Sequence, residues 1–488
     1  MGLQDIFQSK QTIKRNFPLI GRLRYFFEMI RPEIQQYFVE SDTDGRPISR
    51  IDRSMVYQRA KGQTDTTPFG TQHNVYAEGY EWLSHTIVPR NYHQMNHNPR
   101  VRIGNKDCSQ PYEASILNIS AMSFGALSTH AIEALNAGAQ IGGFAHNTGE
   151  GGMSHYHLKH GGDIIWQIGT GYFGARDAEG KFHDENFRKN ALLPQVKMIE
   201  LKLSQGAKPG HGGILPAKKN TPEIAAIRLV APGTTVYSPP YHNAFSTPIG
   251  LIQFLQRLRQ LSDGKPVGFK LCIGRKSEFL GICKAMVQLD IYPDFITIDG
   301  GEGGTGAAPP EFSNSVGMPL LDAIAFVENA LTGFGIRQHI KLIASGKILS
   351  GFSILRAIAL GADACNSARA MMLALGCIQA LRCNSNNCPT GVATQDKELV
   401  AGLDVDDKKT RVANFHKTTV NSFIELLGAT GLEFPRELKR MHINRRVFMN
   451  EVRTFEEIFP SLDNKILLSD NIPEWYKKEM ELAFAEKF

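Results

Sequence analysis

The sequence predicts an α/β protein built as a closed (β/α)8 barrel, and three observations predict it. First, short β-branched runs such as "PVGFKLCIG" and "DFITIDGG" alternate with helical stretches such as "EFLGICKAMVQLD" from about residue 113 onward, which is typical of parallel sheet. Second, at least seven such units follow one another, which favours a barrel over the runner-up, an open doubly wound sheet. Third, glycine-rich segments follow five of the predicted strands, like the loops at the C-terminal face of a barrel.

Three parts are predicted along the chain. Residues 1–110 form an N-terminal helix and loop-rich layer, residues 111–430 the barrel, and residues 431–488 a charged, helical C-terminal extension. The first 40 residues have the pattern of a basic amphipathic helix, in which aromatic residues alternate with arginines. Two alternatives stay open for this helix: it packs on the body as an ordinary surface helix, or it touches a membrane surface or a partner.

The composition is that of an ordinary globular protein. The 488 residues carry a formal net charge of +6, too little for a nucleic-acid-binding protein of this length. No apolar run approaches the length of a membrane span, and the first residues lack the apolar region of a signal peptide. Seven cysteines, an odd number, fit a reducing compartment, so we expect a cytoplasmic protein whose clustered thiols bind metal or do redox work.

The glycine-rich segments predict a ligand site at one end of the barrel, because such backbone lets peptide N–H groups approach a phosphate or a flat ring. The alternative is that each segment is only a tight turn. The "SGK" after the seventh strand precedes a helix predicted to begin near Phe352, which is the arrangement of a barrel phosphate site. Four residues after the last two strands are predicted to hold that phosphate: Gly346, Lys347, Ala368 and Arg369.

One motif is rejected. The segment "GTGYFG" (169–174) satisfies the G-x-G-x-x-G pattern and follows a strand-like run. A dinucleotide-binding fingerprint must open a helix that packs on the sheet, and the charged, turn-like residues that follow show no apolar helical face. We therefore predict a loop here and no NAD(P) domain.

Three of the seven cysteines, Cys377, Cys383 and Cys388, fall close together with the spacing C-x5-C-x4-C. A structural zinc site takes four ligands, and no histidine lies within the segment. Cys365 lies twelve residues earlier in a strand-like run and is predicted to be a buried core thiol. Zinc, an iron–sulfur cluster and a redox disulfide remain alternatives on this spacing alone.

Five motifs, in chain order, resemble one known family. The segments "ISAMSFGALS", "NTGEGG", "QGAKPGHGG…LP", "GGTGAAP" and the three cysteines followed by "PTGVATQD" are similar to the flavin-binding synthase domain of glutamate synthase. The resemblance runs from about residue 90 to residue 430 and extends in particular to the stand-alone FMN-binding members. It implies an FMN-bearing (β/α)8 barrel with a [3Fe-4S] cluster, which reductively aminates 2-oxoglutarate to L-glutamate.

The resemblance also implies roles for single residues. Cys377, Cys383 and Cys388 would each bind one iron of the cluster, and Pro389 after the last of them echoes the Cys-Pro of bacterial ferredoxins. Lys208 and Arg228 match the substrate-binding cations, with Gln205 beside them, since a dicarboxylate calls for cationic partners. Glu150 matches a carboxylate that binds the amine or relays a proton, and Lys270 a cation near the N1–C2=O edge of the flavin. The residues that would pack around the isoalloxazine ring are Met122, Ser123, Gly303, Gly304, Thr305 and Gly306.

The sequence departs from the large enzymes of this family at several positions. His211 and Ile214 stand where those enzymes have Glu and Gln, and Glu311 lies in a stretch that is Ser/Thr-rich there. These positions touch the substrate pocket, so two alternatives remain. One is a related FMN enzyme acting on another 2-oxo acid or amine, such as an N-substituted glutamate; the other is an electron-carrier subunit of a redox complex. The carrier would not need Lys208 and Arg228, and both are present.

The partners follow from what the chain lacks. Its earliest thiol is Cys108, so no glutaminase nucleophile is expected, and the ammonia would come from solution or from an ammonia-supplying subunit. Because no dinucleotide site is predicted, we expect ferredoxin or a separate reductase subunit to donate electrons.

Overall fold

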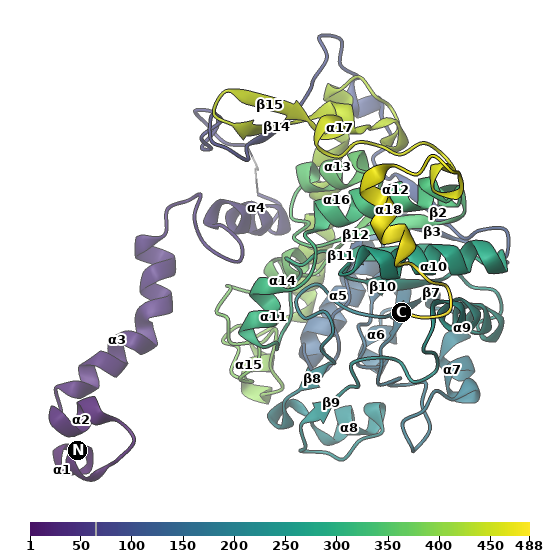
Figure 1. Cartoon of the computed structure of the whole chain (residues 1–488). Helices are drawn as coiled ribbons and strands as arrows, with labels where there is room; N and C mark the ends of the chain where they lie inside the picture. The colour runs from purple at the N-terminus through teal and green to yellow at the C-terminus, as the bar shows by residue number, and fades with distance from the viewer. Residues whose placement is uncertain (64–65) are drawn as a thin grey trace. The chain divides into compact units, whose positions relative to one another are not determined.

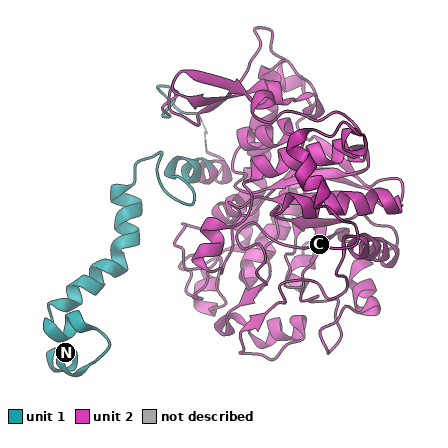
Figure 2. Ribbon diagram, in the orientation of Figure 1, with its two compact units in different colours: residues 1–55, 67–73 teal, residues 56–66, 74–488 magenta. Residues whose placement is uncertain are grey.

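The structure is a computed structural model of the chain, and it describes residues 1–63 and 66–488. The chain divides into two compact units (Figure 2). The first comprises residues 1–55 and 67–73, and the second comprises residues 56–66 and 74–488. Among the described residues, no helix is both long and apolar enough to cross a membrane.

The second unit is built around a closed barrel, to which the described residues contribute eight parallel strands (Figure 1). Neighbours around the ring follow chain order, and β13 pairs with β4 to close it. The predicted (β/α)8 barrel is therefore confirmed. The strands are β4 (Leu117–Ile119), β5 (His146–Asn147), β6 (Ile164–Ile168), β7 (Val196–Lys202), β10 (Val267–Leu271), β11 (Phe295–Asp299), β12 (Lys341–Ser345) and β13 (Ala364–Ser367).

Helices connect successive strands and surround the barrel (Figure 1). The first of them begins where the Ser128 hydroxyl accepts the N–H of Ala131 and ends at Gly143, which takes the left-handed conformation. Within it, a Cβ on Gly138 would lie 2.7 Å from the side chain of Val412, so this glycine lets the long helix that contains Val412 pack closely against it. The helices are α5 (Thr129–Gly142), α6 (His155–Leu158), α7 (Asp184–Ala191), α9 (Pro248–Leu261), α10 (Lys276–Leu289), α12 (Leu320–Gly333), α13 (Gly351–Ala359), α14 (Arg369–Ala374) and α16 (Val405–Ala429).

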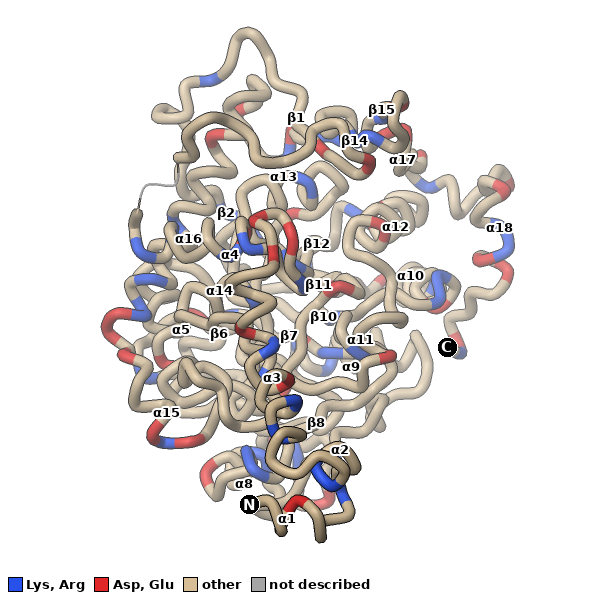
Figure 3. The backbone as a smooth tube through the Cα atoms, turned by 90° about the vertical axis from the view of Figure 1, so that its left-hand side faces the viewer, with Lys and Arg blue, Asp and Glu red and all other residues tan. Residues whose placement is uncertain are grey.

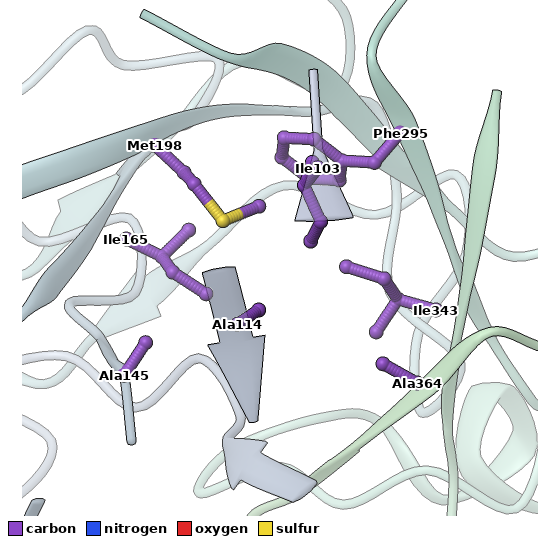
Figure 4. Packing of buried hydrophobic residues seen from close by; sticks show 8 residues of the cluster. All are labelled: Ile103, Ala114, Ala145, Ile165, Met198, Phe295, Ile343 and Ala364. Atoms are coloured by element: carbon purple, nitrogen blue, oxygen red, sulfur yellow. The ribbon is translucent and has the colours of Figure 1, made fainter. Parts of the chain in front are cut away.

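A β-hairpin closes the N-terminal end of the barrel. Strands β2 (Arg100–Ile103) and β3 (Tyr112–Ser115) pair antiparallel in a region that the sequence analysis expects to be loop-rich. Ile103 and Ala114 pack with inward side chains of the barrel strands, including Met198, Phe295 and Ile343 (Figure 4). One inward apolar residue from each of the two short strands fills this end, which leaves the opposite end of the barrel for the ligand.

The remaining elements are loop insertions and terminal segments. The loop after β7 holds β8 (Ile214–Leu215), η3 (Ala217–Lys219), α8 (Pro222–Arg228) and β9 (Val236–Tyr237). Residues 431–488 contain a strand pair as well as helices: β14 (Ile443–Phe448) pairs with β15 (Glu451–Thr454) and with β1 (Glu81–Leu83). Other helices of the second unit are η2 (Tyr92–Gln94), α11 (Pro310–Ser315), η4 (Arg337–His339), α15 (Lys397–Ala401), η5 (Pro435–Glu437), η6 (Arg440–His442), α17 (Phe455–Ile458), η7 (Ile466–Leu468) and α18 (Glu474–Glu481).

The first unit is helical. It contains α1 (Gly2–Phe7), α2 (Thr12–Asn16), α3 (Gly21–Ile34), the π-helix η1 (Gln35–Val39) and the start of α4 (Arg50–Ala60), whose second half belongs to the second unit.

Candidate active site

A carboxylate and a lysine meet at the C-terminal end of the barrel. Glu150 follows β5, and its Oε1 lies 2.8 Å from Nζ of Lys202, the last residue of β7. The same Nζ donates to Oε1 of Gln205 at 2.6 Å. Burial opposes ionisation of Glu150, but Lys202, with Lys208 and Arg228 farther off, holds its pKa below the usual value. Glu150 is therefore an anion at neutral pH inside a cationic surrounding.

Two further cations are buried beside this carboxylate. Lys208 donates to the carbonyl oxygen of Ala307 at 3.0 Å, and Arg228 donates from Nη2 to the carbonyl oxygen of Phe124 at 3.0 Å. Burial lowers the pKa of Lys208 to about 8 and that of Arg228 to about 10, although Glu150 acts in the opposite direction on both. Both side chains carry charge at neutral pH. The sequence-predicted residues Glu150, Gln205, Lys208 and Arg228 are thus brought together.

The guanidinium group of Arg228 has a hydrogen-bond donor that no described residue uses. Within the part of the chain that the structure describes, its buried Nε has no hydrogen-bond partner. The guanidinium group lies over the Phe173 ring, 5.0 Å from the ring centroid, which fixes its plane. A buried donor without a partner is costly, and an anionic ligand would remove that cost.

Glycines leave the room that this arrangement needs. A Cβ on Gly151 would lie 2.6 Å from Nη2 of Arg228, and a Cβ on Gly213 would lie 2.7 Å from Oε1 of Glu150. Neither position can carry a side chain without displacing a charged group. The glycines of "NTGEGG" and "KPGHGG" therefore serve the site and are more than turn residues.

A second lysine–carboxylate pair lies deeper in the barrel mouth. Nζ of Lys270, on β10, is 3.5 Å from Oδ2 of Asp299, the last residue of β11. The same oxygen accepts the backbone N–H of Gly206 at 2.7 Å, so it connects this pair to the loop that carries Gln205 and Lys208. Lys270 is buried, as a cation facing the edge of a flat ligand would be.

The predicted ring-binding residues come from two loops. Met122 is buried after β4, and Ser123 packs under the "NTGEGG" loop, where a Cβ on Gly149 would lie 2.6 Å from the Ser123 amide nitrogen. The second loop, Gly303 to Gly306, follows β11, and Gly304, Thr305 and Gly306 are exposed. Both loops leave the same end of the barrel as Lys270.

The predicted phosphate-binding residues lie on two linked loops. The Ser367 hydroxyl, at the end of β13, donates to the carbonyl oxygen of Ile348 at 2.6 Å and so ties the loop with Gly346 and Lys347 to the one with Ala368 and Arg369. The helix after "SGK" starts at Gly351, capped by Ser350, close to the predicted position. Arg369 reaches the glycine loop, since a Cβ on Gly304 would lie 2.9 Å from its Nε.

The three clustered cysteines are free thiols in a loop beside these segments. Burial raises the pKa of Cys377 to about 12 and also raises that of Cys383, with further contributions from the neighbouring cysteines. Cys388 differs: burial opposes ionisation, but hydrogen bonds from the Thr390 side chain and from backbone N–H groups, that of Ala393 among them, lower its pKa. Within the described residues, no three His, Cys, Asp or Glu side chains are grouped closely enough to hold one metal ion.

The cysteine loop touches the glycine loop. A Cβ on Gly306 would lie 4.0 Å from the Cβ of Cys383, which places the two loops in contact. On the other side, Lys219 is 2% exposed, and its Nζ donates to the carbonyl oxygens of Ala126 and Ala393 at 2.9 and 2.8 Å. Ala126 lies in the loop after β4 and Ala393 in the loop of the cysteines, so Lys219 joins them.

Three functional candidates were not predicted from the sequence: Lys202, Asp299 and Lys219. The first two are the last residues of barrel strands, and a charged residue at the end of a predicted barrel strand was a signal that could have found them. Lys219 offered no such signal, because "PAKKNTPE" has the composition of a surface turn. The rejected "GTGYFG" motif is a loop, as predicted, and Cys365 is fully buried on β13.

His211, one of the departures from the large enzymes, lies at the edge of the site. Its Nδ1 lies 2.8 Å from the carbonyl oxygen of Gly212, and its ring meets Phe312 edge-on at 5.3 Å between centroids. This pair places aromatic surface next to the loop that carries Lys208.

The fold and the site define a (β/α)8-barrel protein with a cluster of buried cations around Glu150 at the C-terminal ends of its strands. Comparison with known proteins gives the family. The profile of the conserved region in glutamate synthase matches residues 66–433, and the chain belongs to the glutamate synthase family. Its match is to the FMN-binding synthase domain of that family.

Three relatives show how far the similarity extends. YerD of Bacillus subtilis (strain 168), a glutamate synthase large subunit-like protein, is 37% identical over 480 residues, which cover 90% of this chain and 91% of that protein. An archaeal glutamate synthase (NADPH) of Methanocaldococcus jannaschii is 38% identical over 323 residues, 66% of this chain and 60% of that protein. A ferredoxin-dependent glutamate synthase of Cyanidium caldarium is 34% identical over 328 residues, 60% of this chain and 20% of that protein.

Proposed function

We propose that this chain is an FMN- and iron–sulfur-dependent glutamate synthase, which reductively aminates 2-oxoglutarate to L-glutamate with ammonia from solution or from a partner. The observation that carries the proposal is the pair of buried cations, Lys208 and Arg228, beside the ionised Glu150. Two cations suit a dicarboxylate, and an anion between them suits an ammonium or imine nitrogen. The family membership supports the same reaction class.

The residues of the pocket fit these roles. Arg228, with its unpartnered Nε, would bind one carboxylate of the substrate, and Lys208 would bind the other. Glu150, held by Lys202, would orient the incoming nitrogen and take up or return its proton. In the net reaction the C2 carbonyl loses its oxygen as water, a C–N bond forms, and two electrons and two protons are taken up.

The flavin site fits FMN by the chemistry of its donors. Lys270 would lie against the electron-rich edge of the ring, and Gly346, Lys347, Ala368 and Arg369 would hold the phosphate on the two linked loops. When bound, FMN supplies the hydride chemistry that no protein side chain provides. Asp299 is the carboxylate that pairs with Lys270 in the buried site, at 3.5 Å.

The cysteine loop fits a [3Fe-4S] cluster better than a single metal ion. A cluster of three irons would take one thiolate per iron, which matches the three free cysteines of this loop, whereas a structural zinc ion takes four ligands. The contact between Gly306 and Cys383 supports a short path for electrons from this loop to the flavin loop. We propose ferredoxin or a separate reductase subunit as the electron donor.

A second candidate is a related enzyme with another 2-oxo acid or amine. The observation that favours it is the His211–Phe312 pair, which replaces an acidic position of the large enzymes by aromatic surface. Anaerobically reduced protein should therefore be mixed with a panel of 2-oxo acids, with ammonium or alkyl amines, while flavin reoxidation and amino-acid formation are followed. Glutamate formation supports the first proposal. Turnover only with another pair supports the second, and no reoxidation with any 2-oxo acid of the panel contradicts both.

The pH dependence of substrate binding should report Lys208. Its pKa of about 8 means that the ammonium is charged below that pH and neutral above it. The KM for 2-oxoglutarate should therefore rise as the pH increases from about 7 to about 9, since the free enzyme loses one of its two substrate-binding cations. In Lys208→Arg the rise should disappear, because a guanidinium stays charged in this range. A KM that rises equally in both proteins would assign the titration to another group.

Lys219 should act as a counter-ion of the cluster. It is a buried lysine that donates to two carbonyl oxygens, and the charged groups that act on it are the thiols of Cys383 and Cys388. Burial lowers its pKa to about 8, while Cys383 and Cys388 favour the charged form. In Lys219→Met the reduction potential of the cluster should become more negative, on the order of tens of millivolts. The neighbouring Lys218 is exposed, so Lys218→Met is the matched control; equal potentials in both variants would contradict the role.

A further inference from the structure

An unusual amount of apolar surface is exposed on α3 and the π-helix η1. The apolar residues recur every three or four positions, which places them on one face of the helix. Phe27 is 57% exposed and Phe38 is 84% exposed. The stripe, as we name this face, consists of Leu23, Phe26, Phe27, Ile30, Ile34, Tyr37 and Phe38.

The helices of this unit are held in place by polar contacts and not by an apolar core. Asp5 on α1 is 2% exposed, and its Oδ1 lies 2.7 Å from Nη2 of Arg22 on α3. A Cβ on Gly21 would lie 2.7 Å from the carbonyl oxygen of Ile13, so α2 and α3 meet through backbone. Of the residues in α1, α2, α3 and η1, all of which the structure describes, the buried ones are Asp5 and Gly21. The stripe is thus a defined surface on a defined fold, and it is not used within the unit.

The charged residues of the same segment are mainly cations (Figure 3). Residues 1–39 contain six Lys and Arg against three Asp and Glu, a net charge of +3. Asp5 pairs with Arg22, and Glu28 pairs with Arg24 at 3.0 Å. On a helical wheel at 100° per residue, Arg24 and Arg31 fall beside the stripe, where they would reach the same surface that the stripe enters.

We propose that this segment lies in the interface of a bilayer that carries anionic lipid, with the stripe inserted among the headgroups and its cations on the lipid phosphates. Aromatic and branched apolar side chains on one face with Arg and Lys around them are the composition of an interfacial helix. With 14 residues and several charges, α3 lies in the membrane plane and does not span it.

A second copy of the chain suits the stripe less well. Pro32 lies within α3 and removes one backbone hydrogen bond, which disturbs the regular packing of two helices along a shared seam. A symmetric pair would also bring the same arginines together, whereas a lipid surface supplies the opposite charge. The proposal concerns the N-terminal unit alone and does not depend on the reaction of the barrel.

The test is sedimentation of the full-length protein with vesicles. The protein should bind phosphatidylcholine vesicles containing about one third phosphatidylglycerol at least tenfold more strongly than vesicles of phosphatidylcholine alone, and salt should weaken the binding. The double variant Phe26→Ser, Phe27→Ser should lose most of the binding, and Arg24→Gln, Arg31→Gln should weaken it by about tenfold or more. The matched control is Ile87→Ser, Val88→Ser, which removes two exposed apolar residues of the second unit and should leave binding unchanged.

Three outcomes would overturn the proposal. One is the absence of binding to anionic vesicles. Another is equal binding by the parent and the double phenylalanine variant. The third is a protein that does not bind vesicles but forms a concentration-dependent dimer in analytical ultracentrifugation, which the phenylalanine variant abolishes. That result would mean that the stripe binds a second copy of the chain. Far-UV circular dichroism and flavin content, measured on every variant, show that the barrel is intact.

Discussion

Replacing Arg228 with glutamine should lower kcat/KM for 2-oxoglutarate by roughly a hundredfold to a thousandfold, while the flavin content stays that of the parent. The guanidinium is buried, rests on the Phe173 ring and has an Nε without a partner among the described residues, so it is placed to bind an anion that enters the pocket. A neutral amide cannot replace a charge-assisted pair in such a site, and the substrate carboxylate would be left desolvated and unpaired.

The flavin should be unaffected because Arg228 contacts neither the phosphate loops nor Lys270. Its hydrogen bond goes to Phe124, in the loop after β4. The chain supplies a matched control in Arg176, which lies over the same Phe173 ring at 5.3 Å and whose buried Nε likewise has no partner among the described residues. Arg176 differs from Arg228 in its surroundings, because the carboxylate that acts on it is Asp177 and not Glu150. Arg176→Gln should change kcat/KM by less than about threefold. If Arg228→Gln behaves like Arg176→Gln, the pocket binds its substrate elsewhere.

A parallel measurement separates binding from positioning. The Arg228→Gln variant should bind 2-oxoglutarate more weakly in a flavin-monitored titration, in which no turnover is required. Loss of turnover with unchanged affinity would mean that Arg228 acts on the reacting nitrogen through Glu150, whose pKa it lowers, and not on the substrate carboxylate.

Much of the barrel was predictable because its strands are short apolar runs buried on both sides. "FITID" and "VGFKL" have this pattern, and both are barrel strands whose residues are all buried. The N-terminal hairpin was missed for the opposite reason. Its strands mix one or two apolar residues with charged ones, since only Ile103, Ala114 and their neighbours face the barrel core. Such a strand carries little periodicity, and tertiary packing alone defines it.

Site residues that lie in recognisable motifs could be predicted from the sequence, whereas those that only the fold brings together could not. Glu150 and Lys208 lie in glycine-rich segments that stand out in the sequence, whereas Arg228, at the end of α8, was predicted from the family resemblance; the three meet in the structure. Lys202 and Asp299 are the last residues of their strands, and only the folded barrel shows that Lys202 pairs with Glu150 and Asp299 with Lys270. Lys219 could not be foreseen, because its burial depends on two loops, around Ala126 and Ala393, that come from distant parts of the chain.

The largest effect should come from the cysteine loop. Protein purified without oxygen should contain about three irons per chain, and Cys383→Ser should reduce this nearly to zero. A cluster with three protein ligands has none to spare, and a serine hydroxyl is a poor substitute for a thiolate that must be deprotonated to bind iron. The FMN content should remain, because the proposed phosphate-binding residues lie on the loops after β12 and β13, before the cysteine loop.

The matched control is Cys108→Ser. Cys108 is a partly buried thiol in the loop of the hairpin that closes the opposite end of the barrel. Its sulfur donates to the carbonyl oxygen of Gly264 at 3.3 Å. A serine can make the same hydrogen bond, so iron and FMN should both be unchanged. Iron and FMN are measured on the same samples by metal analysis and by flavin absorbance after release from the protein. One zinc per chain and no iron would show that the loop binds a different metal. Full iron content in Cys383→Ser would mean that this residue is not a ligand, and the proposed electron path through its contact with Gly306 would then fail as well.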